Sequence, residues 1–192
     1  AALADPRVRI VTDDPRRLLA RGSGRYGLIL ILEPTPVTLF LARLSTVEFY
    51  RLCRDHLAPE GVLVVRSETA PNVLTGETAA LGGSLWGALR EVFPVVRAGP
   101  GPESLLVAGV DSGAVTLDPA VLSERFRKRG VISEVFVPEL FPILFPPERV
   151  AGQEEALRKA AATVAPSRDE RPVSFLHALA RQCLPQVKLD LH

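Results

Sequence analysis

Residues Tyr26 to Leu32 read YGLILIL, and this uninterrupted apolar run decides the fold class. Such a run predicts a strand that is buried on both faces, which is typical of a parallel sheet covered by helices. A second run of this kind, GVLVV, covers Gly61 to Val65. Between them, Ser45 and Glu48 form an S-x-x-E pattern that predicts a capping box at the start of a helix. The order strand, helix, strand predicts an α/β fold.

The same alternation continues on both sides of this stretch. We predict a strand over Arg7 to Val11 (RVRIV) and a helix from Pro15 to Arg21. A longer helix is predicted from Thr75 to Phe93, because leucines recur at helical spacing. Val95 to Ala98 and Ser104 to Val110 then predict a closing antiparallel pair. Residues 1–110 are therefore expected to form a mainly parallel sheet with helices on both faces.

After residue 110 the pattern changes, and residues 111–192 are expected to form a C-terminal α/β appendage. The predicted elements are a helix from Pro119 to Gly130, a strand from Val131 to Val137, a proline-punctuated connector from Pro138 to Pro147, and helices over 147–164 and 172–184.

Composition excludes several classes of function. Lys and Arg number 23 against 22 Asp and Glu, so a net charge of +1 gives no electrostatic basis for binding nucleic acid. Cys53 and Cys183 lie in apolar helical patterns as free thiols, which indicates a reducing, cytoplasmic setting. We expect no metal site, because His56, His177 and His192 are far apart in the sequence. No apolar run is long enough to cross a bilayer.

Acidic residues follow three of the predicted strands. Asp13 and Asp14 follow the first, Glu33 the second and Glu68 the third. Ligands of parallel α/β sheets bind at the carboxyl ends of the strands, so these acids are candidate ligand contacts at one edge. Alternatives remain open: Asp13 or Asp14 can cap the following helix, and Glu33 and Glu68 can be solvated loop acids. Gly22 to Gly24 precedes a strand and predicts a turn instead of a nucleotide-binding loop.

The order of these segments resembles the spermidine and spermine synthase family. The matching segments are DPRVRIVTDD at 5–14, STVEFY at 45–50, LAPEGVLV at 57–64 and EVFPVV at 91–96. The later part resembles the membrane-associated branch of that family, through LDP at 117–119, PPERV at 146–150 and RDERPVSFL at 168–176.

The resemblance implies a partial methyltransferase-like, Rossmann-like fold: residues 1–110 would be the C-terminal part of the synthase-like domain, and 111–192 a family-specific extension. It implies no permanently bound cofactor, decarboxylated S-adenosylmethionine as co-substrate of the parent protein, and a polyamine as the acceptor. Membrane segments are implied for the parent. A polyamine nitrogen is protonated at neutral pH, since amines of this type have pKa values near about 10, so transfer needs a carboxylate that takes a proton.

The sequence departs from the family pattern at the strand ends. Leu32 and Thr35 stand where the resemblance implies two aspartates, and Gly27 replaces another acid. Glu33 is then the candidate catalytic base, although a shift of one residue turns a strand side chain to the other face. The resemblance further implies that Asp13 or Asp14 contacts the adenine, and we assign Glu68 as a candidate substrate contact. The glycine-rich loop and the ribose-binding acid of the family would lie upstream of this sequence.

The chain begins at Ala1 and contains no methionine, which we interpret as a piece of a longer protein. Two functional hypotheses follow: a fragment of an aminopropyltransferase that is inactive as given, or a catalytically degenerate nucleoside-binding or scaffold domain of a membrane protein. Without two upstream strands, the predicted strand Arg7 to Val11 would lack its usual neighbours. We therefore expect dimerisation or a strand rearrangement at the exposed sheet edge.

Overall fold

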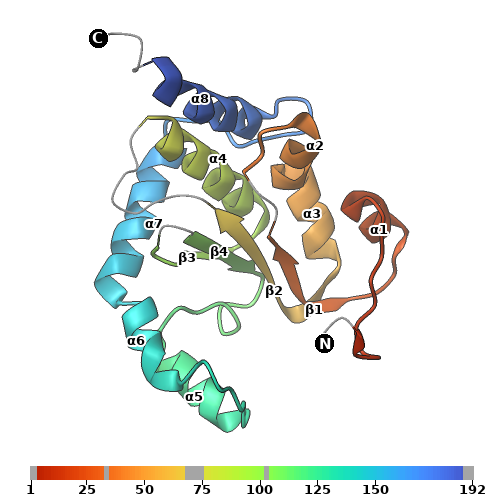
Figure 1. Ribbon diagram of the computed structural model, residues 1–192, viewed down its shortest axis with the longest axis vertical. Coiled ribbons are helices and arrows are strands. Elements are labelled where there is room, and N and C mark those ends of the chain that lie inside the picture. The colour runs from red at the N-terminus through yellow and green to blue at the C-terminus, as the bar shows by residue number, and fades with distance from the viewer. Residues whose placement is uncertain (1–3, 33–34, 68–75, 102–103, 188–192) are drawn as a thin grey trace.

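The computed structural model describes residues 4–32, 35–67, 76–101 and 104–187 and has an α/β fold, as predicted (Figure 1). Its strands are β1 (Tyr26–Ile31), β2 (Leu57–Ser67), β3 (Val95–Ala98) and β4 (Ser104–Gly109), in the spatial order β1-β2-β4-β3. β1 and β2 are parallel, whereas β4 is antiparallel to both β2 and β3. The sheet is therefore mixed, with the expected antiparallel pair at one side.

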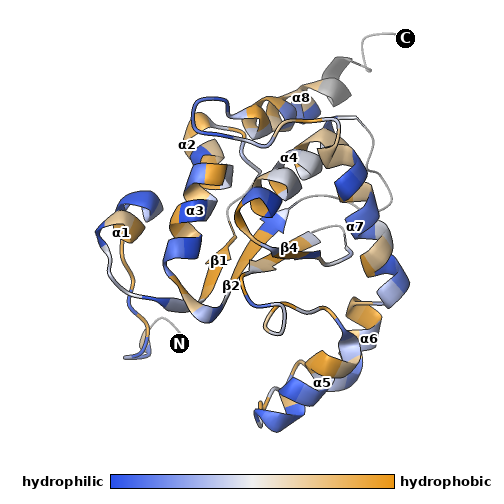
Figure 2. Cartoon of the chain, turned by 180° about the vertical axis from the view of Figure 1, so that it is seen from behind, coloured by the Kyte–Doolittle hydropathy of each residue, from blue (hydrophilic) through white to orange (hydrophobic). Residues whose placement is uncertain are grey.

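Helices α3 (Val47–Asp55) and α4 (Glu77–Val92) cover one face of the sheet. Figure 2 shows them in front of the apolar strands. Alternate residues of each strand point to this face, so Leu63 and Val65 of β2 and Leu106 and Ala108 of β4 are buried there. The predicted leucine stripe of α4 and Trp86 complete this core, as expected.

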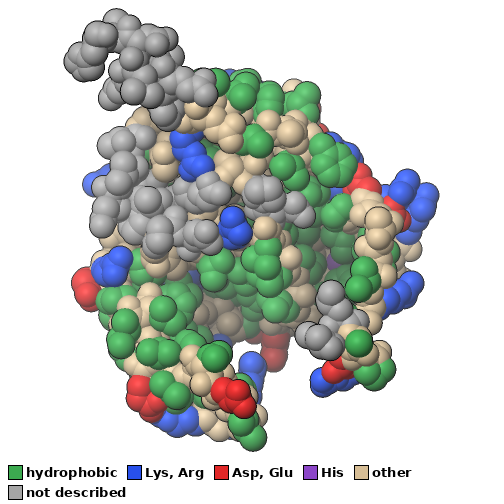
Figure 3. Space-filling model, viewed as in Figure 1, with side chains coloured by type: hydrophobic (Ala, Val, Ile, Leu, Met, Phe, Trp, Pro, Cys, Tyr) green, Lys and Arg blue, Asp and Glu red, His purple; other side chains and the backbone are tan. Residues whose placement is uncertain are grey.

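Among the described residues, the side chains on the opposite face of the sheet are largely exposed. Leu28 and Leu30 of β1 are 57% and 49% exposed, and both are on this side with Val62 and Val64, their partners on β2. Figure 3 shows hydrophobic side chains gathered across the middle of this face. The prediction that β1 is buried on both faces is therefore wrong: the apolar run reports strand propensity, but the described helices α3 and α4 pack against one face only.

The predicted strand over Arg7 to Val11 is also wrong. This segment has no regular secondary structure, and it precedes α1 (Pro15–Arg21), the first predicted helix. A strand requires a hydrogen-bonding neighbour, and the described sheet ends at β1 without including this segment.

Helix α3 begins one residue later than the capping-box pattern predicts. Its N-cap is Thr46, whose Oγ1 accepts a hydrogen bond from the N–H of Phe49 at 3.3 Å. Glu48 does not complete a box with Ser45. It instead accepts a hydrogen bond from the backbone N–H of Asp169 at 3.0 Å, so a tertiary contact replaces the local one. α3 follows a short helix, α2 (Leu39–Ala42), and a 3-10 turn, η2 (Arg43–Ser45).

β2 begins at Leu57, earlier than predicted, so residues 58–60 before Gly61 belong to the strand. Gly61 is required there because a Cβ atom at this position would lie 2.7 Å from the carbonyl oxygen of Tyr26. The register of β1 against β2 shifts between Tyr26 and Leu28 at this close approach.

The C-terminal part contributes helices to the main body. Helices α7 (Pro147–Ala161) and α8 (Val173–Val187) pack on α4, as Figure 1 shows. α4 and α7 approach closely, since a Cβ atom on Gly83 would lie 2.7 Å from the backbone of Ala160. Leu157 of α7 and Ala178 of α8 are fully buried in the same core as the sheet.

Between β4 and α7 the chain forms α5 (Pro119–Lys128), η3 (Pro138–Leu140) and the short α6 (Phe141–Leu144). Asp118 caps α5 as predicted. The predicted strand Val131 to Val137 is wrong: Phe136 packs against Phe126 and Phe141, with ring centroids 5.6 and 5.0 Å apart, and no described strand lies beside the segment.

Candidate functional site

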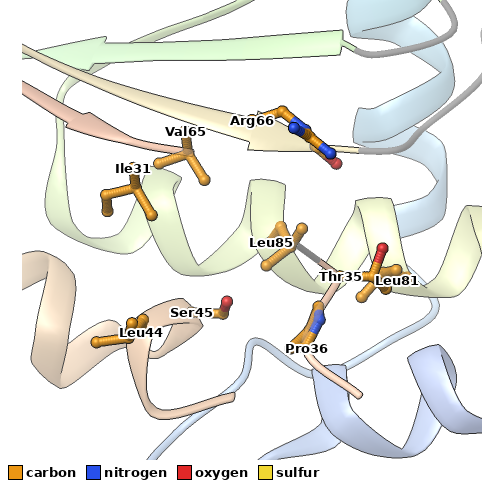
Figure 4. A pocket seen from close by; sticks show the side chains of 10 residues that line it. Ile31, Thr35, Pro36, Leu44, Ser45, Val65, Arg66, Leu81 and Leu85 are labelled. Atoms are coloured by element: carbon orange, nitrogen blue, oxygen red, sulfur yellow. The ribbon is translucent and has the colours of Figure 1, made fainter. Parts of the chain in front are cut away.

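The carboxyl ends of β1 and β2 enclose a small cavity of about 20 Å³, shown in Figure 4. Its walls are apolar side chains from the two strands and from α4, with several polar groups between them. The lining residues are Ile31, Thr35, Pro36, Leu44, Ser45, Val65, Arg66, Ser67, Leu81 and Leu85. This volume holds about one water molecule. The buried hydroxyl of Ser67 has no hydrogen-bond partner among the described residues.

Helix α8 closes one side of this region through two polar contacts. Arg181 donates a hydrogen bond to Oγ1 of Thr35 at 3.4 Å. One turn earlier on α8, Nδ1 of His177 lies 2.7 Å from Oε2 of Glu77, the first residue of α4. The Glu77 carboxylate is therefore engaged by His177, and Arg66 and Arg181 contribute positive charge beside the cavity.

The predicted adenine contacts, Asp13 and Asp14, have structural partners. Asp14 caps α1 by accepting from the N–H of Arg16 at 2.8 Å, and it forms an ion pair with Arg43 at 3.2 Å. Asp13 pairs with Arg17. The hydrogen bond from Arg17 lowers the pKa of Asp13. Partial burial raises the pKa of Asp14, but the N–H groups at the start of α1 and the charge of Arg43 lower it more, so that its pKa lies below the ordinary value. Both acids are thus held as carboxylates, and the capping alternative that the sequence left open holds for Asp14, whereas Asp13 pairs with Arg17.

Glu33 and Glu68, the predicted base and substrate contact, lie outside the described residues. Their sequence neighbours are informative. Thr35, at one of the implied aspartate positions, lines the cavity, whereas Leu32, at the other, is exposed. Ser67, which directly precedes Glu68, lines the cavity as well.

A clamp centred on Asp169 was not predicted from the sequence. Asp169 accepts hydrogen bonds from both terminal nitrogens of Arg16, each at 2.7 Å, and a third from Oγ1 of Thr46 at 2.7 Å. The neighbouring Arg168 binds Glu91 at 2.7 Å. Segment 168–176 resembles a family motif, but nothing in the local sequence identifies partners that lie 77 to 153 residues away.

A larger hollow of about 630 Å³ lies between β3, residues 112–119 and the start of α7. An ion pair between Arg97 and Glu154 at 2.9 Å crosses it. Its size falls in the range of small-molecule sites. The candidate acids Asp13 and Asp14 are not among its lining residues.

The described residues contain no cluster of three or more His, Cys, Asp or Glu side chains that could hold a metal ion. Within the same ranges, no helix is both long and apolar enough to cross a membrane.

Comparison with known proteins finds no matching family model but several curated relatives. The chain is 39% identical over 66 residues to polyamine aminopropyltransferase 1 of Streptomyces coelicolor, 41% over 70 residues to polyamine aminopropyltransferase of Oceanobacillus iheyensis, and 42% over 72 residues to that of Corynebacterium efficiens. These matches cover 34–36% of this chain but only 12–14% of the relatives' own lengths. The chain is therefore similar to polyamine aminopropyltransferases over about a third of its length, and the predicted resemblance to that family is confirmed.

Proposed function

We propose that this chain is the polyamine-binding part of an aminopropyltransferase-like protein, and that Glu33 and Glu68 hold the ammonium groups of the polyamine. The observation that carries the proposal is the similarity to polyamine aminopropyltransferases at 39–42% identity. In the parent protein, the aminopropyl group would pass from decarboxylated S-adenosylmethionine to the polyamine.

The positions of the two acids support this assignment. In the sequence, Glu33 lies between Leu32 and Thr35, and Glu68 follows Ser67. Thr35 and Ser67 line the cavity at the strand ends. Ligands of α/β sheets bind at this end of the strands. A polyamine carries several positive charges at neutral pH and needs carboxylates that are not already engaged by arginines.

Three of the described acids do not meet that requirement. Asp13 and Asp14 are paired with Arg17 and Arg43, and Glu77 is paired with His177. Glu33 and Glu68 are our proposed ammonium ligands because they follow β1 and β2 in the sequence. We propose that Asp13 or Asp14 contacts the adenine in the parent protein. This contact would leave in place the hydrogen bonds by which Asp14 caps α1.

We further propose that the chain by itself transfers no aminopropyl group. Leu32 and Thr35 replace the acids that the family resemblance implies, and neither side chain can accept a proton from an ammonium group. Glu33 is the one candidate base at this strand end.

The second candidate function is a catalytically degenerate nucleoside-binding or scaffold domain. The observation in its favour is that the described lining of the cavity includes Arg66 and no carboxylate that could hold an ammonium group. In that case the chain would bind the thioether nucleoside product, or neither ligand.

Calorimetric titration of the chain with spermidine, and separately with decarboxylated S-adenosylmethionine and its thioether product, distinguishes the two functions. The proposal predicts heat of binding with spermidine and no product in a parallel aminopropyl-transfer assay. Nucleoside binding without spermidine binding would favour the degenerate domain, and transfer of an aminopropyl group by this chain would contradict the proposed inactivity. The same titration and assay on the longer parent protein test the proposed transfer itself.

A further inference from the structure

The hollow of about 630 Å³ beside β3 is separate from the cavity at the strand ends. Its walls are β3, residues 112–119 and the N-terminal half of α7, and we call it the β3 hollow. β3 is the outermost described strand on the side of the sheet away from β1, whereas the strand-end cavity lies at β1, β2 and α4. Figure 1 shows α7 beside β3 and the chain after β4 leading to α5. The two spaces share no lining residue.

Part of the β3 hollow is lined by apolar side chains. Val115 and Leu117 come from the segment after β4, and Val150 comes from α7. All three are buried against the rest of the protein, so they form the floor of the hollow. A hydrocarbon group placed on this floor would be removed from water, which is favourable. The volume of the hollow is sufficient for a ligand of small-molecule size.

Arg97 of β3 supplies a positive charge to this hollow. Its Nε atom is buried and lies 2.9 Å from Oε1 of Glu154, yet 40% of the side chain is exposed. No described residue accepts a hydrogen bond from the two terminal nitrogens of Arg97. A guanidinium whose terminal N–H groups are free offers two parallel donors, which match the two oxygens of a carboxylate.

Glu154 fixes the direction of this guanidinium. The same oxygen, Oε1, also accepts a hydrogen bond from the backbone N–H of Ala98 at 3.2 Å, and the Glu154 side chain is only 13% exposed. Glu154 therefore holds both the strand and the Nε atom of Arg97. An arginine that is already held in one place loses less side-chain entropy when a ligand binds. Glu154 is thus a positioning residue for Arg97.

The charges around the β3 hollow favour a ligand with a single negative charge. Asp118 also lines the hollow, but its carboxylate accepts hydrogen bonds from the first N–H groups of α5. α7 begins at the hollow as well, and its N-cap, Pro146, has no side-chain acceptor, so the positive end of this helix is not neutralised by a cap. A ligand with two negative charges would face Asp118 and Glu154 with one arginine to bind it. A carboxylate therefore fits better than a phosphate dianion.

We propose that the β3 hollow is a second ligand site, which binds a small amphipathic carboxylate. The two terminal nitrogens of Arg97 hold the carboxylate, and the hydrocarbon part of the ligand lies against Leu117 and Val150. Such a ligand bridges β3, the segment after β4 and α7, so its binding stabilises the folded chain. This inference does not rest on the proposed polyamine-binding function, because the two sites share no residue.

Nuclear magnetic resonance spectra of the isotope-labelled chain, titrated with sodium hexanoate, locate the site. We expect saturable shifts of the backbone amides in 95–98, 112–118 and 148–154, the segments that line the hollow. Hexanoate should bind at least about tenfold more tightly than acetate, because its longer hydrocarbon part buries more apolar surface. Hexylamine has the same hydrocarbon part and the opposite charge, so it should cause no saturable shift in these segments. Inorganic phosphate should bind more weakly than hexanoate.

Substitution of Arg97 tests the carboxylate contact. Arg97→Gln should weaken hexanoate binding by at least about tenfold, since a neutral amide replaces the guanidinium. The matched control is Arg129→Gln, because Arg129 is an exposed arginine at the end of α5 and does not line the hollow, so its loss should leave the affinity unchanged. Circular dichroism melting checks that both variants are folded.

Four results would overturn the proposal, and three of them need only the wild-type chain. These are hexanoate shifts that do not saturate or that fall on the exposed face of the sheet around Leu28, equal binding of hexylamine in the hollow, and tighter binding of inorganic phosphate than of hexanoate. The fourth is a folded Arg97→Gln variant that binds hexanoate as tightly as the wild type.

Discussion

The carboxylate of Asp169 and the guanidinium of Arg16 form a two-pronged ion pair, with both N–O distances at 2.7 Å, across 153 residues of sequence. The same guanidinium donates to Oγ1 of Thr46 at 2.9 Å and stacks over the ring of Phe49, 5.6 Å from its centroid. This contact joins α1, the start of α3 and the segment before α8. The N-terminal and C-terminal parts of the chain are thereby held together at one place.

Replacing Asp169 by alanine should lower the free energy of unfolding by about 1 to 3 kcal/mol, because it leaves a mostly buried arginine and a buried hydroxyl without their acceptor. Denaturant unfolding measures the change. The matched control is Asp55→Ala, which removes an exposed acid paired with its neighbour Arg54 and should change stability by less than about 0.5 kcal/mol. Equal effects of the two substitutions would contradict a structural role for the clamp.

The contribution of Asp169 to the free energy of unfolding should decrease as the pH is lowered into the acid range. Burial raises the pKa of Asp169, but the hydrogen bonds from Arg16 and Thr46 lower it more, so that the pKa lies below its ordinary value. A carboxyl group with a lowered folded-state pKa stabilises the fold above its unfolded pKa of about 3.9, and this contribution is lost as the pH falls through the folded pKa. The stability gap between wild type and Asp169→Asn should therefore be constant near neutral pH and narrow below about pH 4. A gap that widens in acid would contradict this account.

Much of the fold could be predicted from local sequence. The apolar runs predicted β1 and β2, the leucine spacing predicted α4, and Asp118 followed by a proline predicted α5, because each of these signals is read from neighbouring residues. The segments Arg7 to Val11 and Val131 to Val137 have equally strong strand signals but no described neighbour strand. Strand propensity indicates that a segment can form a strand, but whether a neighbouring strand is available to pair with it depends on the tertiary structure.

Gly83 should tolerate no side chain, because α4 and α7 meet there. A Cβ atom at this position would lie 2.7 to 2.9 Å from the backbone and side chain of Ala160 and from Ala161. Gly83→Val should destabilise the protein by about 1 to 3 kcal/mol through overpacking. Gly152→Ala, on an open side of α7 with nothing within 4 Å, should instead stabilise it by about 0.5 to 1 kcal/mol. Thermal unfolding of both variants is the test, and a neutral Gly83→Val would contradict the close helix crossing.

The two cysteines should differ sharply in reactivity. Cys53 is fully buried, and burial raises its thiol pKa to about 12 despite the nearby charge of Arg16, whereas Cys183 is exposed. Because the thiolate is the reactive species, one thiol per chain should react with a disulfide reagent at pH 8 and the second only in denaturant. Cys183→Ser should remove the fast reaction. Two fast thiols in the native protein would show that the core around Cys53 opens readily.

The candidate site was predictable only in outline. Strand order placed the acids at the carboxyl ends of strands, and the resemblance singled out Leu32 and Thr35 as departures. The pairing of Asp13 with Arg17 was within reach of the sequence, since the two residues are four apart. The pairing of Asp14 with Arg43 and the approach of Arg181 to Thr35 were not, because these contacts join distant segments through the fold.

The most direct test of the central claim is spermidine titration of three proteins by calorimetry: the wild type, the double variant Glu33→Gln/Glu68→Gln, and the control Glu134→Gln, which removes an exposed acid of the C-terminal part. The account predicts that wild type and control bind alike and that the double variant loses binding by at least about tenfold, since two ammonium ligands become neutral. Equal affinity of all three proteins, or no binding by the wild type, would contradict it.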